Sequence, residues 1–308
     1  MAKWIAKAIV QKTISVFPFK EKLNHVFQKH ITKGVQLTDE HFGNKLMHAA
    51  DHIKYYKKYR GQLNNIKVLE LGSGWYPVVP IALYLSDAGQ TDSLDIQSWM
   101  NKETIMTTIT KFKEWNDKGK LKSYLPEWNE EKWKLLLELP ARTDSISIDD
   151  ALAAIQLKLH LKDARNTGFQ KDSYDFICSN NTFEHIYGDV LINILREFKL
   201  VAKPGAFMCH FIDLSDHFAH FDHSINIYNF LKFSPKGWKI IDNTIQPQNR
   251  LRWKDYLEMY RKVELPVSEE ITREGDLKLL SQVKVHKSYQ SYSQEELAIS
   301  HGYILSEL

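Results

Sequence analysis

Short apolar runs alternate with helical patterns along most of the chain, and each run has the length of a buried strand. The runs lie at 66–71, 91–96, 157–161, 174–179 and 206–212. Strand and helix in alternation predict a mainly parallel sheet with helices on both faces. Such sheets bind ligands at the carboxyl ends of their strands. We therefore expect an α/β protein whose site residues follow the strands.

The run at 66–71 stops at a glycine turn, and Pro77 opens the helix that follows. Gly72 and Gly74 lack a Cβ atom, so a ligand can approach the backbone closely. Glu70 supplies a carboxylate beside the turn. A dinucleotide site would need a third glycine where this chain has Pro77. The turn therefore predicts a nucleotide-type ligand but disfavours a dinucleotide.

Acidic residues close the next two strands. Asp95 ends the second strand, where a carboxylate can accept hydrogen bonds from ribose hydroxyls. Asp163 ends the third strand, where it can accept a hydrogen bond from an adenine amino group. These acids and the turn form an ordered series that resembles the class I S-adenosylmethionine-dependent methyltransferases of the type 11 group. Over about residues 66 to 213, six motifs carry the resemblance: Glu70-Leu71-Gly72-Ser73-Gly74, Asp95-Ile96, Lys162-Asp163-Ala164, Ser173-Tyr174-Asp175-Phe176-Ile177, Phe183-Glu184-His185-Ile186 and Leu200-Val201-Ala202-Lys203-Pro204-Gly205.

The resemblance implies a Rossmann-like sheet of seven strands with S-adenosylmethionine as cofactor. It implies that Glu70 and the glycine turn line the methionine moiety, that Asp95 binds the ribose, and that Asn180 lies near the sulfonium. Tyr76 stands where the family has a third glycine, so the carboxylate end of the cofactor is expected to be held differently. The cofactor-binding candidates are Glu70, Gly72, Ser73, Gly74, Asp95, Ile96, Asp163, Ala164 and Asn180.

Histidines near the ends of the fourth and fifth strands are the candidates for catalysis. Methyl transfer to a hydroxyl needs a base, and the pKa of histidine suits that task. His185 follows the fourth strand, and His210 and His217 lie in a polar cluster at 210–223. Asp213 of the same cluster is a candidate acceptor-binding residue. The spacing of the cluster does not define a tetrahedral site, so we assign no metal.

Two further groups are candidates for acceptor binding. His52 shares one stripe of a predicted helix at 38–59 with His48 and His41, although a polar helix face explains the same pattern. Arg250 and Arg252 form a pair suited to an anionic acceptor, although they also fit an accessory subdomain.

The expected organisation is an N-terminal helical cap at 1–60 and a methyltransferase domain at 61–308, with helical inserts at about 97–156 and 214–262. The first segment is amphipathic and basic. It is expected to pack on its own protein, with a membrane surface as the less favoured alternative. Its apolar face is predicted to contain Ile5, Ala6, Ile9, Val10 and Phe17. A turn at Pro204-Gly205 should precede the fifth strand, and 279–285 or 303–305 should form an antiparallel edge.

Composition narrows the function. The 41 basic and 38 acidic residues leave a net charge of +3, which gives no field for nucleic acid. Two cysteines in apolar runs and no stretch of about 20 apolar residues suggest a cytoplasmic protein. We expect methyl transfer to a hydroxyl or amine of a metabolite, sugar or lipid. A nicotinamide-dependent oxidoreductase and a non-catalytic cofactor-binding module are the alternatives, and the sequence does not predict the oligomeric state.

Overall fold

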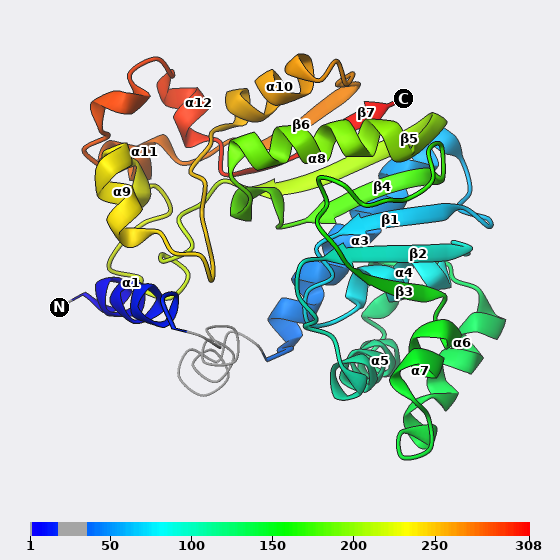
Figure 1. Ribbon diagram of the computed structural model, residues 1–308. Coiled ribbons are helices and arrows are strands. Elements are labelled where there is room, and N and C mark those ends of the chain that lie inside the picture. The colour runs from blue at the N-terminus through cyan, green and yellow to red at the C-terminus, as the bar shows by residue number, and fades with distance from the viewer. Residues whose placement is uncertain (1, 18–35) are drawn as a thin grey trace.

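The computed structural model describes residues 2–17 and 36–308, and its centre is a seven-stranded sheet (Figure 1). The strands are β1 (Lys67–Leu71), β2 (Gln90–Asp95), β3 (Leu157–Leu161), β4 (Tyr174–Asn180), β5 (Ala202–Asp213), β6 (Glu269–Arg273) and β7 (His301–Glu307). Their order across the sheet is β3-β2-β1-β4-β5-β7-β6. Strands β1 to β5 pair in parallel, and β7 pairs antiparallel with both β5 and β6. The expected Rossmann-like α/β sheet is confirmed.

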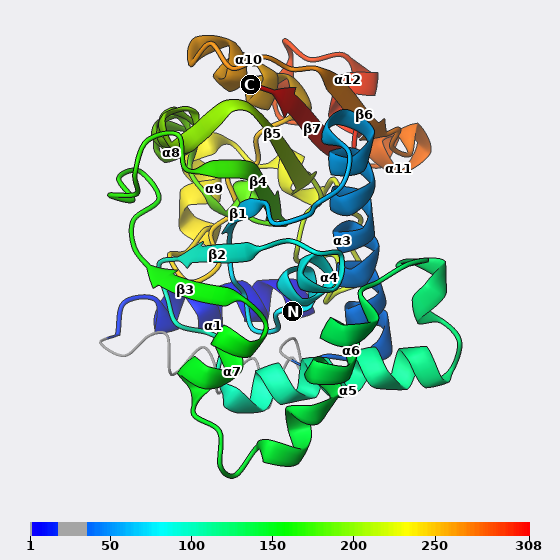
Figure 2. The same ribbon diagram turned by 90° about the vertical axis from the view of Figure 1, so that its right-hand side faces the viewer.

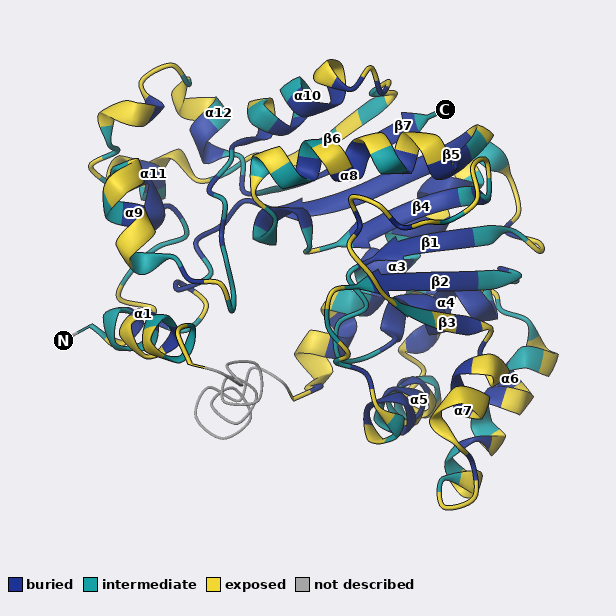
Figure 3. Cartoon of the chain, viewed as in Figure 1, coloured by how far each residue is buried: buried dark blue, intermediate teal, exposed yellow. Residues whose placement is uncertain are grey.

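Helices cover both faces of this sheet. The described helices are α1 (Lys3–Ile14), α3 (Asp39–Arg60), α4 (Val78–Leu85), α5 (Lys102–Asp117), α6 (Glu130–Glu138), α7 (Ile148–Ala154), α8 (Gly188–Val201), α9 (Pro235–Ile241), α10 (Trp253–Lys262), α11 (Leu277–Ser281) and α12 (Gln294–Ala298). Figure 2 shows α3 and α4 on one face and α8 on the other. Successive strand residues alternate between the two faces, so Val68 joins the core under α3 while Leu69 joins the core under α8. Buried residues fill both layers (Figure 3).

Local signals explain where several elements begin. Thr38 caps α3 by accepting a hydrogen bond from the backbone of His41, and Gly61 follows the helix with a φ of +83°. Pro77 lies at the N-cap of α4. Ser147 caps α7, and Ser293 with Glu296 forms a full capping box at α12. The starts of α3 and α4 were expected from the sequence.

The strands differ from the sequence expectations at three places. The Pro204-Gly205 turn lies inside β5, which begins at Ala202 and pairs irregularly with β4 at this point. Residues 279–285 form no strand, because Asp276 caps the short helix α11 there. Strand β6 was not predicted, since its sequence EEITR is mostly polar and only the edge position beside β7 makes it a strand. Residues 303–305 do lie in the antiparallel β7.

The N-terminal helix buries a different face from the one predicted. Trp4, Ala8 and Gln11 are buried, whereas Ile9 and Phe17 are more than half exposed. The Trp4 amide donates a hydrogen bond to Asp222, and the helix packs against α9. Helix α3, in contrast, packs on the sheet beside α4. The cap boundary at residue 60 stays a prediction. Among the described residues, no helix combines the length and the apolar character needed to span a bilayer.

Candidate functional site

The glycine turn after β1 packs tightly against the segment that follows β4. Gly72 has a φ of +91°, and a Cβ atom there would lie 2.3 Å from Oγ1 of Thr182. The Gly72 amide donates a hydrogen bond to the Leu94 carbonyl of β2. The turn is therefore held between the carboxyl ends of β2 and β4, and only glycine fits its first position. Gly74 has a φ of +58°, and the space around its missing Cβ atom is open.

Glu70 lies beneath this turn with its side chain in the sheet. Its Oε2 atom accepts a hydrogen bond of 2.6 Å from Ser93, its register partner on β2. Burial raises the pKa of Glu70 to about 7, despite the opposing effects of the Ser93 hydrogen bond and of the Lys45 charge. The contact of Ser93 with Glu70 could not be predicted from the sequence, because only the pairing of β1 with β2 brings the two residues together.

Asp95 ends β2 beside the turn. Burial raises the pKa of Asp95, and the backbone amides of Gln97, Gly74, Ile96 and Ser73 act in the opposite direction. The carboxylate therefore faces the glycine turn, as the sequence predicted for a ribose-binding acid. The neighbouring Ile96 is 76% exposed, which leaves an apolar side chain free beside Asp95.

Asp163 and Ala164 follow β3, at the outer side of β2. Asp163 is exposed and forms a bidentate ion pair with Arg165, with two oxygen-to-Nε distances of 3.0 Å. Hydrogen bonds from Arg165 lower the pKa of Asp163. Ala164 is buried. An adenine amino group could bind Asp163 only if Arg165 shared or released the carboxylate, which the sequence did not indicate.

Asn180 ends β4 and pairs in register with Phe211 of β5. Its Oδ1 atom is buried and has no hydrogen-bond partner among the described residues. An amide oxygen in this state favours a donor or a cationic group next to it. The predicted position of Asn180 near the sulfonium of a cofactor stays a prediction.

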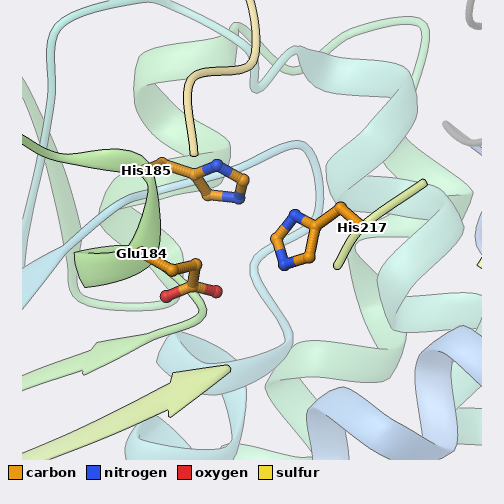
Figure 4. Close-up of side chains that lie close together, drawn as sticks. All are labelled: Glu184, His185 and His217. Atoms are coloured by element: carbon orange, nitrogen blue, oxygen red, sulfur yellow. The ribbon is translucent and has the colours of Figure 1, made fainter. Parts of the chain in front are cut away.

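Beyond β4, three side chains converge on one point (Figure 4). Glu184 and His185 come from the short 3-10 helix Phe183–His185, and His217 comes from the segment after β5. One potential ligand atom from each lies within 4.8 Å of the other two. Two of the three candidate catalytic histidines, His185 and His217, are thus brought together, and Glu184 lies beside them.

The protonation states in this cluster follow from burial. Burial and the neighbouring His217 lower the pKa of His185 to about 4, so its imidazole is neutral at neutral pH. Nδ1 of His185 lies 2.7 Å from the Pro247 carbonyl, which requires the proton on Nδ1 and leaves Nε2 as an acceptor. Burial raises the pKa of Glu184 well above its usual range.

Asp213 ends β5 beside this cluster. Its oxygens lie 3.4 Å from His217 Nε2, 3.7 Å from His220 Nε2 and 3.2 Å from His301 Nε2. Burial alone would raise the pKa of Asp213, but the three histidines beside its carboxylate hold that pKa well below the usual range. Residue His301 was not predicted. It meets Asp213 because β7 pairs with β5 in that register.

Two predicted histidines lie away from this edge. His210 is fully buried on β5, shares a hydrogen bond of 2.8 Å with Ser179 and stacks on Phe183. His52 is also fully buried, between α3 and the sheet, with Nδ1 3.0 Å from Sγ of Cys209. Both rings therefore lie in the core of this structure. The expected roles of His210 in catalysis and of His52 in acceptor binding stay predictions.

The two arginines are also structural. Arg252 is fully buried and donates hydrogen bonds to the carbonyls of Leu214, Leu297 and Ile299. Arg250 is 9% exposed, donates to the Phe230 and Phe233 carbonyls and has its guanidinium 4.8 Å from the Trp238 ring centre. Backbone carbonyls take up part of the donors of each guanidinium group, while both Nε atoms lack a partner among the described residues. The expectation that the two arginines bind an anionic acceptor stays a prediction.

Comparison with known proteins places this site in a class. Residues 141–210 match the family model described as a methyltransferase domain. The match covers less than half of the chain and supports the methyltransferase class that the strand-end motifs predicted. S-adenosylmethionine is the methyl donor expected for that class. No curated protein matches the chain.

Solved structures of several methyltransferases are similar to this chain at low identity. A putative sarcosine dimethylglycine methyltransferase from Galdieria sulphuraria is 13% identical, with 84% of this chain and 85% of that chain covered and a TM-score of 0.46. Geranyl diphosphate C-methyltransferase from Streptomyces coelicolor A3(2) is 11% identical, with 89% and 86% covered and a TM-score of 0.46. A putative S-adenosylmethionine-dependent methyltransferase from Listeria monocytogenes is 12% identical, with 84% and 98% covered and a TM-score of 0.43. The class assignment rests on the family match and on the sheet.

Proposed function

We propose that this enzyme binds S-adenosylmethionine across the carboxyl ends of β1, β2 and β4 and transfers its methyl group to a hydroxyl or amine of a small acceptor. The observation that supports the proposal most is the meeting of the Gly72–Gly74 turn with Asp95, where open space lies beside Gly74. An enzyme of this class needs its cofactor at such an edge.

The parts of the cofactor are assigned by the chemistry of the side chains. Glu70 and the turn 72–74 hold the methionine end, and Asp95 accepts hydrogen bonds from the ribose hydroxyls. Ile96 offers exposed apolar surface to the adenine. Asp163 and Ala164 lie further out along the same edge. Asn180, whose buried Oδ1 has no partner among the described residues, faces the sulfonium.

His185 is the group proposed to receive the proton of a hydroxyl acceptor. Its Nε2 atom is free to accept because Nδ1 is held by the Pro247 carbonyl. Its lowered pKa keeps the ring neutral, although it also makes the ring a weak base. Asp213 and His217 border the same space and are proposed to contact the acceptor. A cytoplasmic location also remains a prediction.

Replacement of Gly74 by alanine is expected to weaken binding of S-adenosylhomocysteine at least about tenfold, because the new methyl group would occupy space proposed for the ligand. The measurement is calorimetric titration of the purified protein, with NADH as a second ligand that we expect not to bind. NADH binding in place of S-adenosylhomocysteine would support the oxidoreductase alternative.

Gly119→Ala is the matched control for this substitution. Gly119 has a φ of +69° and, like Gly74, open space at its missing Cβ atom. Both variants therefore carry a similar backbone cost, and only Gly74→Ala should lose affinity. Equal affinity in the two variants would remove the turn from the cofactor site.

Asp95→Asn is expected to reduce affinity for S-adenosylhomocysteine by about 10- to 100-fold, since hydrogen bonds to a charged acceptor contribute about 1.5–3 kcal/mol. Deoxyadenosine analogues that lack the ribose hydroxyls should bind the wild type weakly and should lose little more affinity in the variant. Asp144→Asn, at an exposed position, provides the control. If the hydroxyl-lacking analogues lost as much affinity in Asp95→Asn as the complete ligand does, the contact between Asp95 and the ribose would be contradicted.

A further inference from the structure

We propose that Glu184, His185 and His217 form a binding site for a divalent first-row transition-metal ion such as Zn²⁺, Co²⁺ or Mn²⁺. The three side chains point toward a common space, and one ligand atom from each lies within 4.8 Å of the other two (Figure 4). This spacing suits three ligands around one ion, since metal-to-ligand bonds of about 2.0–2.2 Å separate neighbouring ligand atoms by roughly 3–4 Å.

Glu184 provides the first argument. Glu184 is 2% exposed, and neither of its carboxylate oxygens has a hydrogen-bond partner among the described residues. A buried carboxyl group without partners is costly, and proteins normally satisfy such a group with hydrogen bonds or with a metal ion. The backbone places this carboxyl next to two imidazoles, both of which can act as metal ligands.

His185 provides the second argument. A metal-binding histidine almost always donates its other ring N–H to a carbonyl or carboxylate, which sets the tautomer and the ring orientation. Nδ1 of His185 lies 2.7 Å from the Pro247 carbonyl. This contact leaves Nε2 unprotonated, with its lone pair available to an ion.

His217 completes the set and has a carboxylate behind it. Its Nε2 atom lies 3.4 Å from Oδ2 of Asp213 but makes no hydrogen bond of good geometry. Asp213 also has His220 and His301 within 3.7 Å, so its carboxylate would lie as an outer anionic group beside the bound ion. The position of Asp213 at the end of β5 anchors this outer shell to the sheet.

The donor set decides the class of ion. Two imidazole nitrogens with one carboxylate favour transition-metal ions, whereas Mg²⁺ and Ca²⁺ prefer oxygen ligands. Three protein ligands leave at least one coordination position for water or another oxygen ligand. The proposal does not depend on the assigned cofactor contacts, because the metal would bind without the methyl donor. It is an alternative to the role of His185 as a base, since an ion would occupy the same Nε2 atom.

The test uses Co²⁺ alone, added to full-length protein that has been treated with a chelator and returned to buffer. We expect one Co²⁺ per chain, visible d–d absorption bands, and a higher melting temperature that Zn²⁺ also produces. Glu184→Gln and His217→Gln should each weaken Co²⁺ binding about 100-fold or more, and Asp213→Asn about 10- to 100-fold.

His223→Gln is the control, because His223 is an exposed histidine of the same segment. It should bind Co²⁺ as the wild type does. Circular dichroism of each variant without metal establishes that it is folded, and Glu184→Gln keeps the shape of the side chain. Absence of d–d bands in the folded wild type, or equal Co²⁺ affinity in the wild type and Glu184→Gln, would overturn the proposal. Such a failure would leave binding of S-adenosylhomocysteine unaffected and so would not bear on the proposed methyl transfer.

Discussion

Lowering the pH below 6.5 is expected to reduce the free energy of unfolding of this protein steeply. Three buried histidines alone should contribute about 4 kcal/mol per pH unit to this loss. Burial lowers the pKa values of His48, His52 and His210 from 6.5 to about 3. Below pH 6.5 the unfolded chain binds protons at these residues while the native protein does not, so the free energy of unfolding falls as the pH falls. The loss continues down to the folded pKa values near 3.

Two glutamates oppose this loss over part of the range. The raised pKa of Glu70, about 7, means that the native protein holds this proton more tightly than the unfolded chain does. Glu184 behaves similarly, because burial raises its pKa as well. The two glutamates therefore stabilise the native state increasingly as the pH falls toward 4.5, which is the ordinary pKa of a glutamate side chain. Below that pH their contribution to stability is constant. The steepest net loss is therefore expected between about pH 4.5 and pH 3.

Urea unfolding at a series of pH values would measure this slope. His52→Gln should reduce it by about 1.4 kcal/mol per pH unit, since one titrating group is removed. An amide can retain the contact to Cys209, and Nε2 of His52 has no partner to lose. The exposed His223→Gln variant should leave the slope unchanged. If NMR titration finds His52 protonating near pH 6.5 in the native protein, the explanation fails.

Arg252→Met is expected to lower the free energy of unfolding by about 3 kcal/mol or more, which is the second large effect. The fully buried guanidinium binds the carbonyls of Leu214, Leu297 and Ile299. Leu214 directly follows β5, whereas Leu297 lies in α12 and Ile299 lies shortly before β7. Removing the donors leaves buried acceptors unsatisfied, at a cost of about 1–3 kcal/mol each before relaxation. The substitution therefore loosens the attachment of β7 and its preceding helix.

Arg261→Met on the same helix is the matched control. Arg261 is exposed and pairs with Glu258 three residues earlier, and an ion pair between two exposed side chains adds little to stability. Both proteins should bind S-adenosylhomocysteine with similar affinity while folded, because neither arginine lies at the glycine turn. A loss of less than about 1 kcal/mol in Arg252→Met would mean that the three carbonyls find other partners, and would contradict the structural role.

The cofactor edge was largely predictable because its signals are local in the chain. A glycine turn needs particular backbone angles, and the acids lie at strand ends that hydrophobic patterning reveals. Gly72 and Asp95 therefore appear in the sequence in the roles that the fold allows. The acceptor side was less predictable. His210 and Arg252 are polar residues in polar-looking segments, and the sequence contains no sign that the core encloses them.

Patterning along the chain was thus enough to predict the order in which the parallel strands β1 to β5 appear and the candidate residues at their ends, since each depends on residues within a few positions of one another. Tertiary structure alone decided which polar groups are buried, which face of α1 packs, and that Glu184 meets His217. Those outcomes depend on contacts between distant segments, whose register and burial are set by packing of the whole sheet and its helices.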